Sequence, residues 1–186
     1  MLKGFAKSLS LLPLLLLAQS NLGGGSKLEK AVFAGGCFWC MQPPFEDLKG
    51  VKQVLTGYTG GKTEKPSYEE VCSGKTGHFE AVEVAYDPNE VSYSKLLEVF
   101  WQNIDPADAS GQFADKGQQY RTAVFYQNED QKNSAEGSKN KIALKMGLNN
   151  HVATQIIKAS KFYPAEDYHQ NYYKKCPLKY KTYKTL

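Results

Sequence analysis

The sequence predicts an α+β protein in which helices pack on one mixed β-sheet and long loops join the elements. The chain has 186 residues, 41% hydrophobic and 23% charged, which suits a single folded domain and excludes a disordered chain. Segments typical of strands and of helices intermingle along it. They lack the regular β-α repetition of a doubly wound sheet. A two-layer arrangement is therefore favoured.

The first twenty residues predict a secretory signal peptide. Two lysines precede an apolar run at residues 9–18, and Ala18 and Ser20 suit signal-peptidase cleavage. The run is about ten residues long, half of what a spanning helix needs, so no stable membrane anchor is expected. We expect residues 1–20 to be removed, 21–29 to form a flexible leader, and 30–186 to form a single catalytic domain with a basic tail. The protein would be exported, periplasmic or secreted, and monomeric.

The first half of the domain contains three strand candidates. Residues 30–34 are apolar, and Gly35-Gly36 turns the chain into a helix that begins at Cys37 and extends to Leu48 at most. Residues 51–59 form the second strand candidate and end at a glycine pair. A short helix at 67–73 and a glycine-bounded turn follow, and then the clearest strand, at 78–86, which ends at Asp87-Pro88.

The second half begins with a helix at 93–103, where apolar residues recur at helical spacing and predict packing on the sheet. Residues 105–120 are polar and irregular, a long loop of the kind that often carries function. A strand at 122–126 precedes a helix at 128–144, in which Asn128 and Gln131 have capping-box spacing. A strand at 152–158 and a final helix at 165–175 complete the prediction.

Charge and cysteine content exclude several function classes. The net charge of +4 is too small and too evenly spread to predict nucleic-acid binding. The four cysteines are too few for a disulfide scaffold, and one C-x-x-C pair without a second does not make a zinc site. We therefore expect no metal and no bound cofactor. Redox chemistry at the close pair, Cys37 and Cys40, is the remaining functional interpretation.

The motif GCFWC at residues 36–40 places a cysteine after a glycine turn, at the start of a helix. Free amide groups and the helix dipole at that position favour thiolate over thiol, which makes Cys37 a candidate nucleophile. Cys40 lies one turn further, close enough to form a disulfide with an oxidised Cys37. Phe38 and Trp39 could form an apolar wall. Alternatively, both aromatic residues belong to the core and the cysteines are inert.

Glu80 is a candidate acid. Strand alternation puts it on the same face as Val82, Val84 and Tyr86, so burial of that face would raise its pKa and let it donate a proton. The alternative is a glutamate at the strand end that reaches water. Glu83, on the opposite face, is expected to be solvated or paired.

Tyr58 and Tyr120 each place a hydroxyl near glycine at the end of a predicted element, and Asp115 precedes Tyr120 in the long loop. Tyrosine occurs twelve times in the chain, so either residue alone is more often a packing or surface group. The three histidines form no recognisable triad with a nucleophile. We interpret His169 as structural.

Six strings in order, GCFWC with GYTGG, GHFEAVEVAYDP, FWQNIDP, DKGQQYR and FYPAEDYHQNYY, closely resemble the A-type peptide methionine sulfoxide reductases. The resemblance covers nearly all of residues 31–177. It implies a ferredoxin-like two-layer sandwich with a mixed sheet. It also implies reduction of the S epimer of methionine sulfoxide, in proteins and as the free amino acid, through a cysteine sulfenic acid and a disulfide. A thioredoxin-like dithiol would be the external reductant and partner.

The resemblance also implies roles for individual residues. Cys37 matches the family's nucleophile, and Phe38 with Trp39 its methyl-binding wall. Glu80 matches the acid that activates the sulfoxide oxygen. Tyr58 and Tyr120 match tyrosines that hydrogen-bond this oxygen, and Asp115 matches an aspartate whose hydrogen bonds help to hold the site.

The sequence departs from many relatives in its C-terminal segment. Those relatives resolve the sulfenic acid with cysteines in a glycine-rich tail, whereas residues 172–186 are rich in lysine, lack glycine and hold only Cys176. Cys40 is slightly favoured as the resolving residue, with Cys176 close behind, and Cys72 is interpreted as passive.

Two other functions remain open at this point. The chain could be a general thiol-disulfide oxidoreductase that uses Cys37 and Cys40, although Phe-Trp between the cysteines is unlike the thioredoxin motif. It could also be a module that binds methionine peptides without turnover. Loss of Cys37 would leave such binding intact and would abolish catalysis.

Overall fold

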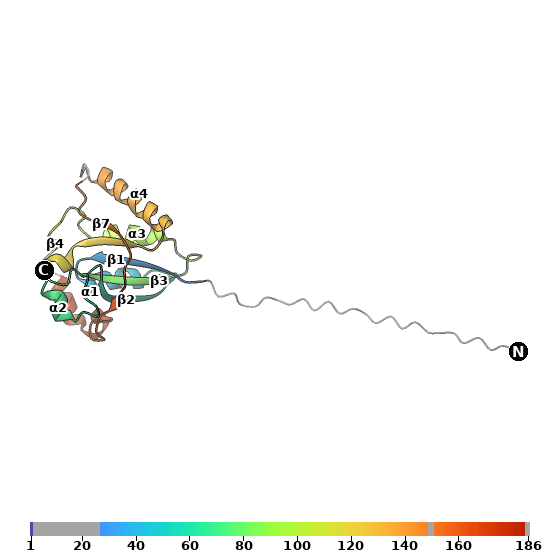
Figure 1. The fold of residues 1–186 in the computed structure, drawn as a ribbon, viewed down its shortest axis with the longest axis horizontal. Coiled ribbons are helices and arrows are strands. Elements are labelled where there is room, and N and C mark those ends of the chain that lie inside the picture. The colour runs from blue at the N-terminus through green and yellow to red at the C-terminus, as the bar shows by residue number, and fades with distance from the viewer. Residues whose placement is uncertain (2–26, 149–150, 185–186) are drawn as a thin grey trace.

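The computed structural model describes Met1 and residues 27–148 and 151–184 (Figure 1). The predicted signal peptide after Met1, and the leader up to residue 26, lie outside the described residues. The elements are β1 (Glu29–Gly35), α1 (Phe38–Glu46), β2 (Val51–Thr59), α2 (Tyr68–Cys72), β3 (Phe79–Tyr86), α3 (Tyr93–Gln102), β4 (Gly111–Gln112), β5 (Asp115–Lys116), the 3-10 helix η1 (Gln118–Tyr120), β6 (Thr122–Tyr126), α4 (Glu129–Lys145), β7 (Gln155–Lys158), β8 (Tyr163–Pro164), α5 (Tyr172–Lys175) and α6 (Pro177–Lys184).

The main sheet has six strands in the order β7-β6-β1-β3-β2-β8. Within its central four strands, β6-β1-β3-β2, each adjacent pair is antiparallel, and α1 and α3 form the crossovers from β1 to β2 and from β3 to β6. This is the split β-α-β arrangement of ferredoxin-like folds. β7 adds a parallel strand beside β6, and β8 pairs antiparallel with β2. The predicted α+β class with a mixed sheet is confirmed.

The sheet separates two apolar clusters. On one face, Phe33, Val82 and Val84 pack with buried residues of α1, α3 and α4. On the other face, a smaller cluster around Phe79 and Phe125 is covered by apolar side chains in and after β7, including Phe162. Helices therefore form one layer and the sheet the other, as predicted, and the sheet's second face is covered by irregular chain rather than by helices.

Gly36 makes the turn from β1 into α1 possible. Its φ of +84° is a conformation that side chains disfavour, and an added Cβ would lie 2.6 Å from Cβ of Gln112. Because the chain can turn there, Cys37 becomes the N-cap of α1 in extended conformation, with no side-chain cap hydrogen bond.

Gly57, in β2, permits the close approach of β8. A Cβ there would lie 2.5 Å from Cζ of Phe162 and closer still to the carbonyl oxygen of Tyr163. We expect Gly57→Ala to destabilise the fold by about 1–3 kcal/mol, because the paired backbone of β8 would have to move away from the added methyl group. Gly137, mid-helix in α4, has nothing within 4 Å of its added Cβ, so Gly137→Ala should stabilise by about 0.5–1 kcal/mol. Thermal unfolding of both variants checks this, and equal shifts would contradict it.

Two expectations in the second half of the chain are only partly met. β7 begins at Gln155, three residues later than predicted. At α4, Asn128 accepts a hydrogen bond from the backbone N–H of Gln131, as a cap should, but the Gln131 side chain contacts the backbone of Gln127 and Lys30 instead of closing the box. A reciprocal capping box forms at α2, between Ser67 and Glu70.

The predicted helix at 165–175 is wrong. The backbone N–H of Ala165 donates to the carbonyl of Thr56, and Asn171 has a left-handed φ of +55°, so helix begins only at Tyr172. It stops before Cys176, whose conformation is not helical and which precedes a proline, and α6 then starts at Pro177. The basic C-terminal segment is thus two short helices, drawn in red near α1 and α2 (Figure 1).

Among the described residues, no helix combines the length and the apolar character that crossing a membrane requires.

Candidate active site

The candidate site lies at one end of the sheet. Because neighbouring central strands are antiparallel, the last residues of β1 and β2 lie at the same end as the first residues of β3 and β6. Cys37 lies two residues after β1, Tyr58 is the next-to-last residue of β2, Glu80 is the second residue of β3, and Tyr120 lies two residues before β6. The topology therefore gathers residues that are up to 83 positions apart in the sequence (120 − 37).

Cys37 and Glu80 meet at the first turn of α1. Cys37 is 8% exposed and Glu80 is 1% exposed. The backbone N–H of Phe38 donates to Oε2 of Glu80 at 3.1 Å, so the carboxyl group lies directly beside the nucleophile's own backbone. The expectation that strand alternation buries Glu80 with Val82, Val84 and Tyr86 is correct.

Burial raises the pKa of Glu80 to about 8, although the hydrogen bond from the Phe38 N–H opposes this, and the charges of Asp115 and Cys40 raise it further. At neutral pH the carboxyl is therefore mostly protonated. A neutral acid in a dry site can donate a proton or a strong hydrogen bond to a substrate oxygen.

The pKa of Cys37 differs from the sequence expectation. The Trp39 N–H at the helix start lowers it, as expected, but a hydrogen bond between the Cys37 and Cys40 side chains raises it, as do burial and the Glu80 charge. The net shift is upward, so the resting thiol is protonated. Helix geometry alone predicted the opposite because it did not include these neighbours.

Tyr58 is paired across the strands with Glu80, and its ring lies 5.9 Å from that of Phe38. Its hydroxyl donates to Oε2 of Glu166 at 2.9 Å. Glu166 also accepts from the backbone N–H of Tyr68 at 2.9 Å. Burial opposes ionisation of Glu166, yet these hydrogen bonds and one from its own backbone lower its pKa. In the described conformation the Tyr58 hydroxyl is thus directed to an anchoring carboxylate.

Phe38, Trp39 and His169 form an aromatic cluster beside Cys37. Phe38 is 1% exposed and lies 5.0 Å from the His169 ring. The indole N–H of Trp39 donates to Nδ1 of His169 at 3.1 Å, and the half-buried indole stacks on Tyr172 at 3.8 Å. Two apolar aromatic faces next to a thiol can hold a small apolar group such as a methyl.

His169 is held as a neutral ring. Burial lowers its pKa against the opposing charges of Glu166 and Glu69. Since Nδ1 accepts from Trp39, the proton is on Nε2, which is buried, lacks a hydrogen-bond partner and lies 3.9 Å from Oε2 of Glu166. His169 is thus interpreted as structural because its ring lies between the Trp39 indole, from which it accepts a hydrogen bond, and the Glu166 carboxylate.

Tyr120 and Asp115 come from the long loop, which holds the β4–β5 hairpin and η1. Asp115 lies in β5 and Tyr120 ends η1, and both are half-buried. Burial raises the pKa of Tyr120, and so do the charges of Glu80 and Cys37, so its hydroxyl stays protonated. Burial also raises the pKa of Asp115, with Lys116 opposing.

All four cysteines lie in the described part of the chain, and none forms a disulfide there. Cys40 is half-buried and hydrogen-bonded to Cys37. Cys176 is half-buried between α5 and α6. Cys72 is exposed at the end of α2.

Sequence reasoning did not select Glu166 or Tyr172 as site residues. Both lie within the string FYPAEDYHQNYY, which was used only for the resemblance. Their contacts reach from the C-terminal segment to Trp39, Tyr58 and Tyr68, over 98 to 133 positions of sequence (for Trp39 and Tyr172, 172 − 39). No local pattern carries such pairings.

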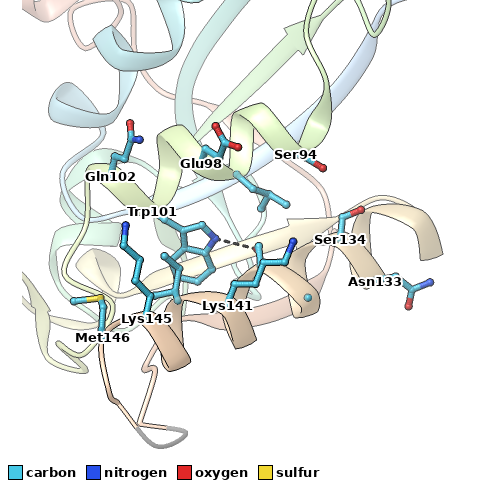
Figure 2. Close-up of a pocket in the computed structure, with 13 residues that line it drawn as sticks. Ser94, Glu98, Trp101, Gln102, Asn133, Ser134, Lys141, Lys145 and Met146 are labelled. Carbon is cyan, nitrogen blue, oxygen red and sulfur yellow. Dashed lines mark hydrogen bonds between the residues drawn. The ribbon is translucent and has the colours of Figure 1, made fainter.

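The groove between α3 and α4 is separate from this site. It encloses about 760 Å³ and contains Trp101, whose indole N–H donates to Ser138, with Lys141 and Met146 nearby (Figure 2). None of the predicted site residues lines it. Within residues 27–148 and 151–184, no group of three or more His, Cys, Asp or Glu side chains could hold a metal ion.

Comparison with known proteins agrees with this geometry. Residues 29–186 match the family model described as peptide methionine sulfoxide reductase. The chain is similar to peptide methionine sulfoxide reductase MsrA of Bacillus subtilis (55% identity, 86% of this chain, 90% of the relative). It is also similar to that of Listeria innocua (54%, 84% and 88%).

Solved structures show the same relationship. Reduced Mxr1 from Saccharomyces cerevisiae gives a TM-score of 0.77 at 31% identity, covering 82% of this chain and 87% of that one. Methionine sulfoxide reductase A of Corynebacterium diphtheriae gives 0.77 at 33%, covering 83% and 78%. Since a buried cysteine and a protonated glutamate meet at a helix start in a chain that matches this family over its whole described domain, the protein belongs to the peptide methionine sulfoxide reductases, which are oxidoreductases.

Proposed function

We propose that Cys37 and Glu80 reduce the S epimer of methionine sulfoxide, in proteins and as the free amino acid, and so repair oxidised proteins under oxidative stress. The observation that carries this proposal is the placement of Oε2 of Glu80 3.1 Å from the Phe38 N–H, next to the Cys37 thiol. A sulfoxide sulfur becomes electrophilic only as its oxygen receives a proton or strong hydrogen bonds. The buried, neutral Glu80 supplies such a donor, and the protonated Tyr120 is a second.

In the first step, the sulfur of Cys37 attacks while the sulfoxide methyl lies against Phe38 and Trp39. The S=O bond breaks, its oxygen ends on Cys37, and the thiol proton ends on that oxygen, so the products are methionine and the Cys37 sulfenic acid. Sulfur of the substrate is reduced by two electrons, and Cys37 is oxidised by two. Glu80 lends its proton during the transfer and recovers it, which explains why a protonated rather than an ionised acid suits the site.

In the second step, we propose that Cys40 condenses with the sulfenic acid, which releases water and forms a Cys37–Cys40 disulfide. The hydrogen bond between the Cys37 and Cys40 thiols supports Cys40 as the resolving residue, because the two sulfur atoms are already in contact. Cys176 instead lies at the junction of α5 and α6. A thioredoxin-like dithiol would then reduce the disulfide and itself become oxidised. A structure of Mxr1 from Saccharomyces cerevisiae in complex with Trx2 has a similar fold, at 20% identity and a TM-score of 0.56.

A racemic peptidyl methionine sulfoxide, with excess dithiothreitol and chiral separation of the epimers, tests the reaction. Consumption that stops at half, with only the S epimer lost, is expected. Complete consumption would refute the stereoselectivity, and no consumption by a folded sample would refute the activity.

We expect Cys40→Ser to separate the two steps. The variant should form about one equivalent of methionine per enzyme, at a rate within tenfold of the unmutated protein, and then stop when a thioredoxin-like donor is the only reductant. Cys176→Ser is the matched control and should continue to turn over. If Cys40→Ser turns over with this donor and Cys176→Ser stops after one equivalent, Cys176 is the resolving residue.

We further propose that residues 1–20 direct export and that the reductase works in the periplasm or outside the cell. The apolar run after two lysines supports this. Mass spectrometry of the protein recovered from the expressing cell's exterior or periplasm should show a chain starting after Ser20, and an intact chain held in the cytoplasm would refute export.

A further inference from the structure

A polar pocket of about 530 Å³ is lined by segments at the same end of the sheet as the candidate active site. Three chain segments form it: the loop after β2, the loop before β3, and the start of η1. Its lining consists of Gly60, Gly61, Lys62, Thr63, Gly74, Lys75, Thr76, Gly77 and Gln118. None of these residues has a role in the reaction proposed above.

Each of the three segments leads directly to a candidate catalytic residue. Gly60 is two residues after Tyr58, Gly77 is three before Glu80, and Gln118 is two before Tyr120. At about 3.3 Å per residue of extended chain, Gly60 and Gly77 lie roughly 7–10 Å from Tyr58 and Glu80. Gln118 lies in the same short 3-10 helix as Tyr120. An extended peptide with its sulfoxide at Cys37 would therefore place a side chain two or three positions away at the pocket.

The pocket is held in shape by His78. Nδ1 of His78 accepts from the backbone N–H of Gly61 at 3.1 Å, and Nε2 is hydrogen-bonded to the carbonyl of Thr63 at 2.8 Å. The backbone N–H of Lys62 donates to the carbonyl of Thr76 at 3.1 Å, which ties the two loops together. A site whose loops are already fixed loses little conformational entropy when it binds a ligand.

The charge of the pocket is positive. Lys62 and Lys75 line it and are exposed, and no carboxylate is among the lining residues. In the described part of the chain, neither lysine takes part in an ion pair, whereas Lys30, Lys52 and Lys116 each contact a carboxylate. Glu64 is exposed in the same loop and is not part of the lining.

We propose that this pocket is a subsite for a carboxylate side chain two or three residues from the oxidised methionine, and that Lys62 and Lys75 make acidic peptides preferred substrates. The inference rests on the active site proposed above, because its position relative to Cys37 and Glu80 defines which substrate residue reaches the pocket.

Three acetylated and amidated peptides test the proposal. They carry one S-methionine sulfoxide and differ only in having glutamate, glutamine or lysine at the second and third positions on both sides. With the unmutated protein and dithiothreitol, we expect kcat/KM to be about three- to tenfold higher for the glutamate than for the glutamine peptide, mainly through KM, and lowest for the lysine peptide. The preference should shrink in 0.5 M salt, because exposed charges are then screened.

Charge reversal of the two lysines identifies the source of the preference. In the variant Lys62→Glu/Lys75→Glu, the ratio of kcat/KM between glutamate and glutamine peptides should fall below one, whereas Lys62→Arg/Lys75→Arg should keep it above one. Lys141→Glu/Lys145→Glu, on α4, makes the same change of net charge and should also keep the ratio above one. The glutamine peptide gives each variant its own reference.

A ratio near one in the unmutated protein would overturn the inference, and so would equal loss of the preference in both glutamate variants, since net charge would then be the cause. Reduction of the glutamine peptide by a Cys37→Ser variant would instead overturn the active site on which the inference rests.

Discussion

Replacing Cys37 with serine is expected to abolish the reduction of methionine sulfoxide, with kcat lowered by at least about 10⁴-fold. The oxygen of the substrate must end on the attacking atom. Sulfur accepts it as a sulfenic acid, but the serine hydroxyl would have to become a hydroperoxide, which is far less stable. The side chain is only 8% exposed and changes by a single atom, so the fold should persist and the loss should be chemical.

The measurement is a single turnover in the Cys40→Ser background, where the sulfenic acid is not converted to the Cys37–Cys40 disulfide. Enzyme is in excess over peptide, methionine is quantified by chromatography, and the sulfenic acid is trapped with dimedone. Cys72→Ser is the control, because this cysteine is exposed at the end of α2, and it should form both products. Methionine formed by Cys37→Ser at more than about a hundredth of the unmutated rate would show that another group is the nucleophile.

Replacing Glu80 with glutamine should lower kcat by about 10²–10³-fold and at the same time stabilise the fold. The amide oxygen can still accept from the Phe38 N–H, but the amide cannot donate a proton as an acid does. For the unmutated protein, kcat/KM should fall as pH rises through about 8, where the buried carboxyl ionises. The glutamine variant should lack this fall.

The stability effect follows from the same pKa. Because the pKa is about 8 in the folded protein and 4.5 for the ordinary side chain, the contribution of Glu80 is fully present below pH 4.5 and is lost as pH rises to about 8. Glutamine avoids that loss, so the variant should be more stable by on the order of 1–3 kcal/mol near pH 7, and equally stable near pH 4.

Denaturant unfolding at pH 4, 7 and 9 checks this expectation. Glu83→Gln is the matched control, since Glu83 is on the opposite face of β3 and pairs with Lys30. If Glu80→Gln and the unmutated protein have the same free energy of unfolding at all three pH values, burial of Glu80 does not destabilise the folded protein.

The sequence predicted the parts of the fold that depend on local patterns. Alternation in β3 placed Glu80 on the buried face, and the glycine pair before Cys37 placed this residue at the start of α1. The six motifs added the candidate site residues, which the topology brings to one end of the sheet.

What local patterns missed depends on contacts between distant segments. The nearby Cys40 raises the pKa of Cys37 most, and Glu80, which reaches Cys37 from β3, raises it further. The C-terminal segment fails to form the predicted helix because Gln170 hydrogen-bonds both backbone groups of Thr56, at 3.0 and 2.9 Å, and holds the chain in an irregular path. Such bonds to a strand 114 positions earlier leave no signal in nearby residues.

The attachment of that segment has a consequence for biosynthesis. The side chains of Gln42 and Glu46 and the backbone of Thr56 hydrogen-bond residues 170–173, and Tyr172 stacks on Trp39, so this late segment completes the wall around the first cysteine of the domain. β1, α1, β2 and β3 can pair as soon as they leave the ribosome or the translocation channel, but the thiols then lack this cover. Only a chain synthesised through Tyr173 has an enclosed reaction centre, so a product terminated before this residue can resemble the fold without being able to repair a substrate.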